Sequence, residues 1–172
     1  PVDITADIIY QERSGEHQRI HLFRPARIPP YSDALPARLP VIVHVPGSAW
    51  HRQFLWMSLR RAVQTASSGI AFAVVEYRPS EIAPFPAQVE DAKAAIRFLR
   101  ANAEKYGLDP DRIGIWGDSS GGHTAAFVGI TGDYELNDGP YPEQSSEVCC
   151  VIDWFGPSDL CELCRADSGT DN

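Results

Sequence analysis

The chain has 172 residues, the size of one ordinary domain, and 44% of them are hydrophobic, which is enough to form a sizeable core. Its 15 lysines and arginines against 23 aspartates and glutamates give a formal charge of −8, and no basic block could follow a phosphate backbone, so we expect no nucleic-acid partner. No apolar stretch reaches the roughly 18 residues of a membrane span, and residues 1–17 lack the basic and apolar regions of a signal peptide. We therefore expect one domain over residues 1–172 and a cytoplasmic location, or a secreted one if a signal peptide has been removed.

The first part of the chain predicts a hairpin followed by a long surface loop. Residues 4–13 and 18–25 are rich in β-branched and aromatic side chains, and the turn-forming pair Ser14-Gly15 separates them. The proline-rich residues 24–40 show little helical or strand periodicity. We interpret them as a loop within one domain rather than as a linker between two.

The middle of the chain predicts alternating strands and helices. The apolar runs at residues 41–45 and 70–77 are typical of buried parallel strands, and residues 54–68 between them predict a helix. Residues 85–107 predict an amphipathic helix that ends at Gly107. Its apolar face comprises Val89, Ala92, Ile96, Leu99, Ala103 and Tyr106, and its opposite face carries Glu90, Lys93, Arg97, Arg100 and Glu104.

The same alternation continues to the end of the chain. Residues 108–112 predict a turn, residues 113–116 a short strand, residues 120–132 a helix and residues 148–155 a further apolar strand. Strands that alternate with helices imply right-handed crossovers. The fold class that we expect is α/β, with a mostly parallel central sheet covered by helices on both faces.

All four cysteines lie late in the chain. Cys149 and Cys150 belong to an apolar run, where small thiols are expected to pack in the core. Cys161 and Cys164 form a C-x-x-C pair, but no histidine follows to complete a metal site. We expect no metal and no cofactor, and a redox or zinc module is the least favoured interpretation.

The stretch GIWGDSSGGH, residues 114–123, carries the chemistry. A serine needs a base and oxyanion donors to attack a carbonyl, and G-x-S-x-G places the serine on a strained turn between a strand and a helix. Gly117 to Gly121 fit this pattern, after a predicted strand and before a predicted helix. We therefore predict that Ser119 is a nucleophile and that the Ser120 N–H is an oxyanion donor.

A second small-residue loop, PGSAW at residues 46–50, follows the strand at 41–45. Alone it is only a tight turn. Beside a serine elbow it predicts two further oxyanion donors, the N–H groups of Ser48 and Ala49. Trp50 and His51 are then predicted to contact the substrate.

The chain resembles the α/β-hydrolase superfamily, and within it the esterase/lipase group that includes feruloyl-esterase-like and carbohydrate-acyl esterases. The resemblance rests on residues 74–126, with Tyr77-Arg78, Phe85-Pro86 and Asp91, and on VIDWFGPSDL at 151–160. The loop that reads PGSAW here commonly reads H-G-G-G-W in that group, and Ser120 stands where alanine is frequent. The resemblance implies hydrolysis of a small-molecule carboxylic ester through an acyl-enzyme.

The catalytic base and acid are not evident. In the superfamily a catalytic acid and then a histidine follow the serine, on loops after the seventh and eighth strands, whereas only six strands are expected here. His123 should point along its own helix and pack there, and His51 is better placed to line a pocket. We expect a domain that stops after the sixth strand, with the acid and the histidine beyond residue 172 or in a separate polypeptide.

Two other functions stay open. An amidase or peptidase would use the same fold and the same Ser119. A non-catalytic binding protein of this fold would explain both the altered loop and the missing histidine.

Overall fold

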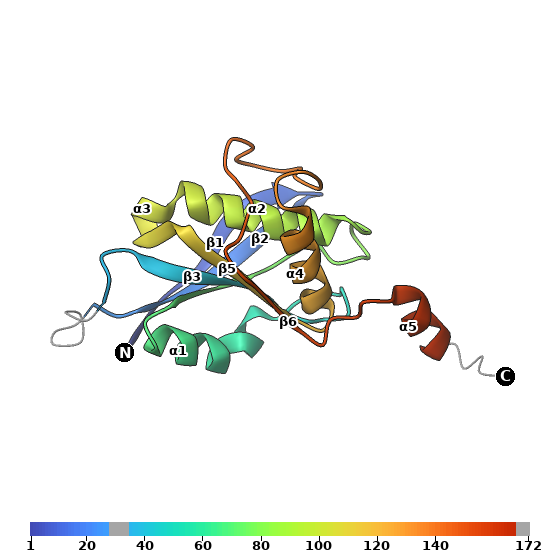
Figure 1. Ribbon diagram of the computed structural model, residues 1–172, viewed down its shortest axis with the longest axis horizontal. Coiled ribbons are helices and arrows are strands. Elements are labelled where there is room, and N and C mark those ends of the chain that lie inside the picture. Colours follow the sequence, from blue (N-terminus) through green and yellow to red (C-terminus); the bar gives the residue numbers. More distant parts are fainter. Residues whose placement is uncertain (28–34, 168–172) are drawn as a thin grey trace.

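The computed structural model describes residues 1–27 and 35–167, so part of the proline-rich loop and residues 168–172 lie outside the described residues. The described chain forms a six-stranded sheet in the order β1-β2-β4-β3-β5-β6 (Figure 1). The strands are β1 (Val2–Arg13), β2 (Glu16–Pro25), β3 (Leu39–Val45), β4 (Ala71–Val75), β5 (Leu108–Asp118) and β6 (Val151–Trp154). The β1–β2 hairpin and the β2–β4 pair are antiparallel, and the pairs among β4, β3, β5 and β6 are parallel. The predicted α/β class and all six predicted strands are confirmed.

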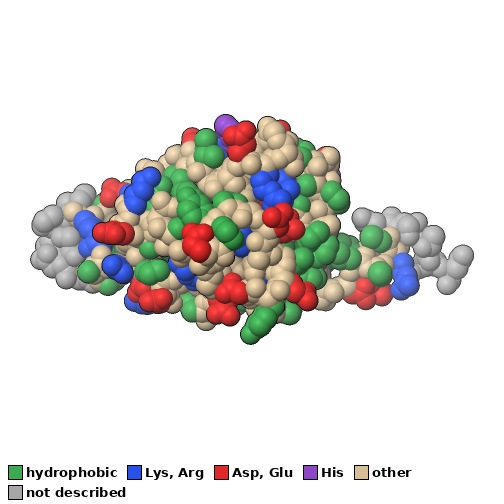
Figure 2. Space-filling model, turned by 90° about the horizontal axis from the view of Figure 1, so that it is seen from above, with side chains coloured by type: hydrophobic (Ala, Val, Ile, Leu, Met, Phe, Trp, Pro, Cys, Tyr) green, Lys and Arg blue, Asp and Glu red, His purple; other side chains and the backbone are tan. Residues whose placement is uncertain are grey.

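Helices cover both faces of this sheet (Figure 1). On one face lies α1 (Leu59–Ser67), preceded by the 3₁₀ turn Leu55–Ser58; on the other lie α2 (Ala87–Ala101), the short α3 (Ala103–Tyr106) and α4 (Ser120–Thr131). A last helix, α5 (Leu160–Asp167), projects away from the sheet. Figure 2 shows this projection from above, with acidic and basic side chains interspersed over the body of the molecule. Within the described ranges, no helix is both long and apolar enough to cross a membrane.

The alternation of side chains along β4 builds two cores. Ala71, Ala73 and Val75 face the core beneath α2 and α4, whereas Phe72 and Val74 face the core beneath α1. Successive residues of a strand point to opposite faces, so a strand buried on both faces must be apolar throughout. This burial fixes the parallel strands whose carboxyl ends support the candidate site.

The charged face predicted for the helix at 85–107 is buried at its centre, whereas Glu104 near its end is exposed. Lys93 and Arg97 are 0% and 1% exposed, because the segment of residues 132–147 lies over them. Lys93 Nζ donates to the carbonyl oxygen of Gly132 at 2.7 Å. Arg97 Nε donates to that of Pro140 at 3.0 Å. The helix is buried on both sides, and its long cations remain hydrogen-bonded to main-chain oxygens.

Two local expectations near the last strands were wrong. The turn predicted at 108–112 is part of β5, where Leu108 pairs with Leu39 and an irregularity in register precedes the pairing of Ile113 with Val41. Cys149 and Cys150 are exposed rather than packed in a core. The reason is that they precede β6, which lies at the edge of the described sheet and is exposed along its length. In the described sheet β6 pairs with β5 alone, so its apolar side chains are left exposed.

Candidate active site

Ser119 occupies the sharp turn between β5 and α4. Its backbone angles, φ 54° and ψ −126°, are costly for any residue with a β-carbon, of order 1–3 kcal/mol. The Ser119 N–H donates to the carbonyl oxygen of Trp154 at 2.9 Å, and its own carbonyl oxygen accepts from His123 N–H at 3.1 Å. The strained strand-to-helix turn that the G-x-S-x-G pattern predicted is therefore present.

The glycines around this serine leave no space for a side chain. A β-carbon on Gly117 would lie 1.9 Å from the Gly121 carbonyl oxygen, and one on Gly121 would lie 2.0 Å from that of Val45. Both obstacles are backbone atoms, which cannot rotate away. The close approach brings β3 and the start of α4 together, and it explains why the pattern requires glycine.

Residues 46–50, here called the oxyanion loop, pack directly against the turn. A β-carbon on Gly47 would lie 2.9 Å from Ser119 Cβ. The Ser48 N–H does not face an open site as predicted; it donates to Ser120 Oγ at 3.0 Å. The cause is the hydroxyl of Ser120, which supplies an acceptor that alanine lacks. Across the described residues, the N–H groups of Ala49 and Ser120 have no hydrogen-bond partner, so both remain predicted oxyanion donors.

Tyr77 anchors the oxyanion loop, a role that the sequence reasoning missed. Its hydroxyl donates to the Pro46 carbonyl oxygen at 2.9 Å and lies 2.9 Å from Ser48 Oγ. The side chain is 1% exposed, and this burial raises the pKa of the phenol. The sequence could have indicated this role, because Tyr77 is the first residue with a hydroxyl group after the apolar strand β4 and so lies near the carboxyl end of a parallel strand.

His123 is a packing residue, as expected from its place one turn beyond Ser119. Its ring is perpendicular to that of Trp50, with centroids 5.3 Å apart, and it also contacts Phe85 and Phe127. Burial lowers the pKa of His123, which favours a neutral ring. Within residues 1–27 and 35–167, no hydrogen bond joins the Ser119 hydroxyl to a histidine.

His51 lies at the surface beyond the oxyanion loop. Its Nδ1 pairs with the carboxylate of Glu81, and this hydrogen bond lowers the pKa of Glu81. The Trp50 carbonyl oxygen accepts from Ser80 N–H at 2.9 Å, so the loop is tied to the segment that follows β4. Trp50 and His51 stay predictions as substrate contacts.

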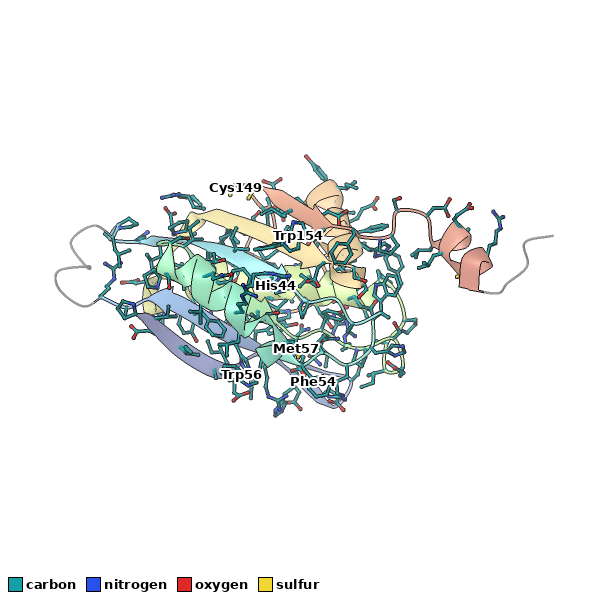
Figure 3. The ribbon with its side chains drawn as sticks, turned by 90° about the horizontal axis from the view of Figure 1, so that it is seen from below. His44, Phe54, Trp56, Met57, Cys149 and Trp154 are labelled. Atoms are coloured by element: carbon teal, nitrogen blue, oxygen red, sulfur yellow. The ribbon has the colours of Figure 1, made fainter. Side chains whose placement is uncertain are left out.

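A charged cluster braces the other side of the serine turn, where α1 meets the sheet. Arg61 donates to Asp118 Oδ1 and to His44 Nε2, both at 3.1 Å. Its guanidinium carbon also lies 4.7 Å from the centre of the Trp116 ring and 4.9 Å from that of the Trp154 ring. His44 and Trp154 lie on this face of the sheet (Figure 3). The hollow beside them, about 560 Å³, is lined in part by Arg61, Asp118 and both tryptophans. Burial lowers the pKa of His44 to about 4, so the imidazole is neutral and accepts from Arg61.

The C-x-x-C cysteines lie apart from this region. Cys161 and Cys164 are both exposed on α5, which projects from the body of the molecule. No group of three or more His, Cys, Asp or Glu side chains suited to a metal ion occurs in the part of the chain that the structure describes.

Comparison with known proteins gives consistent matches. The BD-FAE family model matches residues 31–172. Esterase LipC of Mycobacterium tuberculosis is 32% identical over 122 residues, which are 70% of this chain and 30% of LipC. A solved structure described as a truncated form of carbohydrate esterase from gut microbiota superimposes with a TM-score of 0.78 at 30% identity, covering 92% of this chain and 58% of that one. A bifunctional GH43-CE protein of Bacteroides eggerthii gives a TM-score of 0.78 at 35% identity, covering 91% of this chain and 21% of that one. The chain thus spans less than two thirds of these relatives.

Proposed function

This chain belongs to the BD-FAE family, with an α/β-hydrolase fold, and from that premise we propose that it is a carboxylic ester hydrolase that acts through an acyl-enzyme on Ser119. The observation that carries the proposal is the placement of Ser119 on a strained turn at the start of α4, against the oxyanion loop. Backbone strain of this kind persists where the surrounding structure enforces it, and it clusters at active sites. The names of the relatives, esterase and carbohydrate esterase, support the same activity.

The proposed reaction has two steps. Ser119 Oγ attacks the ester carbonyl carbon, its proton passes to a base, and the carbon–oxygen bond to the alcohol breaks as that alcohol takes up a proton. The N–H groups of Ala49 and Ser120 stabilise the negative charge on the carbonyl oxygen, and the positive end of the α4 dipole adds to this field. Water then hydrolyses the acyl-enzyme and releases the acid.

We assign the base and the acid to the remaining part of a hydrolase domain, outside these 172 residues. Two observations support this assignment. Neither His123 nor His51 hydrogen-bonds to Ser119, since one packs among aromatic rings and the other pairs with Glu81. The edge strand β6 also exposes apolar side chains, with Val151 40% and Trp154 45% exposed, as expected of a strand that lacks its neighbour. The intact mass of the natural protein tests it, because a single 19.0 kDa species with full esterase activity would contradict it.

Labelling with a fluorophosphonate probe tests the nucleophile. We expect the natural protein to gain one adduct per chain, located at Ser119 by mass spectrometry, and Ser119→Ala to gain none. Ser67→Ala, which removes an exposed serine on α1, is the matched control and should label normally. Resistance of the natural protein to labelling would instead favour the non-catalytic binding protein.

Substrate comparison then separates esterase from amidase. Ser119 serves either reaction, because the leaving group is decided by the residue that protonates it. We expect turnover of p-nitrophenyl acetate and much slower turnover of p-nitroacetanilide. Faster cleavage of the anilide would favour the amidase or peptidase interpretation. Trp50→Ala should raise KM more than it lowers kcat if Trp50 contacts the substrate.

A further inference from the structure

The oxyanion loop holds an unfavourable backbone conformation without the glycines that would make it easy. Ala49 has φ 51° and Trp50 has φ 60°, both in the left-handed region that favours glycine. A residue with a β-carbon stays there only where contacts on several sides hold it. The loop must therefore be anchored, and the anchors decide where the Ala49 N–H points.

The described contacts supply anchors of two kinds. Tyr77 and Ser80 tie the loop to the end of β4, through the carbonyl oxygens of Pro46 and Trp50. Among the described residues, one hydrogen bond ties the loop to α4, from Ser48 N–H to Ser120 Oγ at 3.0 Å, and it joins residues 72 positions apart. Ser120 is 1% exposed, so the acceptor end of this bond is buried, whereas Ser48 at the donor end is partly exposed.

We propose that the Ser120 hydroxyl is a positioning residue that sets the geometry of the oxyanion hole by holding Ser48, and with it the strained loop, against the start of α4. The inference rests on the proposed function of Ser119. The two remaining donors, Ala49 N–H and Ser120 N–H, lie on the two segments that this bond joins. Ser120 thus contributes twice: its amide is a donor, and its hydroxyl fixes the position of the other donor while occupying the Ser48 N–H.

The expected consequence is a loss in kcat with little change in KM. In Ser120→Ala the Ser48 N–H loses its acceptor, and the loop relaxes away from its left-handed angles. Removal of an oxyanion donor lowers kcat by 10²–10³-fold, so displacement of one donor should lower it by about 10- to 100-fold. KM should change less than about threefold, because the donors act on charge that develops in the transition state.

A double-mutant cycle separates positioning from general destabilisation. In an Ala49→Gly background the left-handed angle of residue 49 is no longer strained, so the loop needs its anchor less. There Ser120→Ala should lower kcat by less than about threefold. Thr131→Ala, which removes a different hydroxyl of α4 that bonds within the helix at 2.7 Å, is the matched control and should leave kcat unchanged in both backgrounds.

The kinetics use the natural protein with p-nitrophenyl acetate, alongside fluorophosphonate labelling of each variant. An unchanged kcat in Ser120→Ala that still labels at Ser119 would overturn the positioning role alone. An equal loss in both backgrounds, or a loss confined to KM, would overturn it as well. Failure of the natural protein to label would overturn the proposed function, and the positioning role with it.

Discussion

Replacement of Gly121 by alanine should damage the fold far more than the same replacement two turns later in α4. The added β-carbon would lie 2.0 Å from the Val45 carbonyl oxygen, whereas ordinary contacts begin near 3.4 Å, so the end of β3 and the start of α4 would have to separate by 3.4 − 2.0 = 1.4 Å. Overpacking typically costs about 1–3 kcal/mol, and here the obstacle is backbone that is already paired in the sheet. We expect a loss of about 3 kcal/mol, or roughly 6–12 °C in Tm for a domain of this size.

Gly129→Ala provides the matched comparison. Its β-carbon would meet Val151 Cγ2 at 2.4 Å, but this obstacle is a side-chain methyl group, which can shift more easily than the backbone carbonyl that faces Gly121. Alanine also gains up to about 1 kcal/mol of helix propensity over glycine, so the net change should stay within about 1 kcal/mol. Urea unfolding followed by fluorescence of the four tryptophans measures both variants. Equal stabilities of the two variants would refute the argument from backbone contact.

Three further predictions concern His44, the strain at Ser119 and the buried Lys93. Burial lowers the pKa of His44 from 6.5 to about 4. Between pH 6.5 and pH 4 the unfolded chain therefore binds a proton that the folded chain does not. The free energy of unfolding should fall by up to about 3 kcal/mol as the pH decreases across this range. His44→Gln should flatten this decrease in urea titrations across that range, and an unchanged slope would count against it. Ser119→Gly should be more stable than Ser119→Ala by about 1 kcal/mol, because only glycine tolerates φ 54° without strain, and equal unfolding midpoints would argue against strain. Lys93→Met should lower the free energy of unfolding in urea by about 1–3 kcal/mol, because the Gly132 and Glu135 carbonyl oxygens lose their donor. Lys105→Met, at an exposed lysine, is the control and should change it by less than about 0.5 kcal/mol. An unchanged stability of Lys93→Met would contradict the role of these bonds.

The elements that sequence predicted well are those set by local chemistry. The buried runs that became β3 and β4 are apolar because both faces of the sheet are covered, and the left-handed Gly107, with φ 67°, ends the α2–α3 segment as expected. Asp159 caps α5 by accepting from Glu162 N–H at 3.0 Å, which is the ordinary use of an aspartate just before a helix. Each of these signals lies within a few residues of the feature that it predicts.

The features that sequence did not predict depend on segments that meet only in the folded chain. Lys93 and Arg97 follow a helical spacing that normally marks a solvated face, and no periodic pattern shows that residues 132–147 will lie over them. The bond between Ser48 N–H and Ser120 Oγ likewise depends on how closely β3 and α4 approach. The exposure of Cys149 follows from the edge position of β6, which composition does not encode.

The burial of the α2 cations has a consequence for how the chain tolerates change. Lys93, Arg97 and Arg100 bind the segment 132–147 through six of its main-chain carbonyl oxygens and the side-chain oxygen of Asn137. A carbonyl oxygen is present whatever the side chain, so these bonds to α2 place little constraint on the side chains of the segment. The path of this segment is therefore set largely by three side chains of the helix beneath it, and changes among its exposed side chains need not disturb the sheet that carries Ser119.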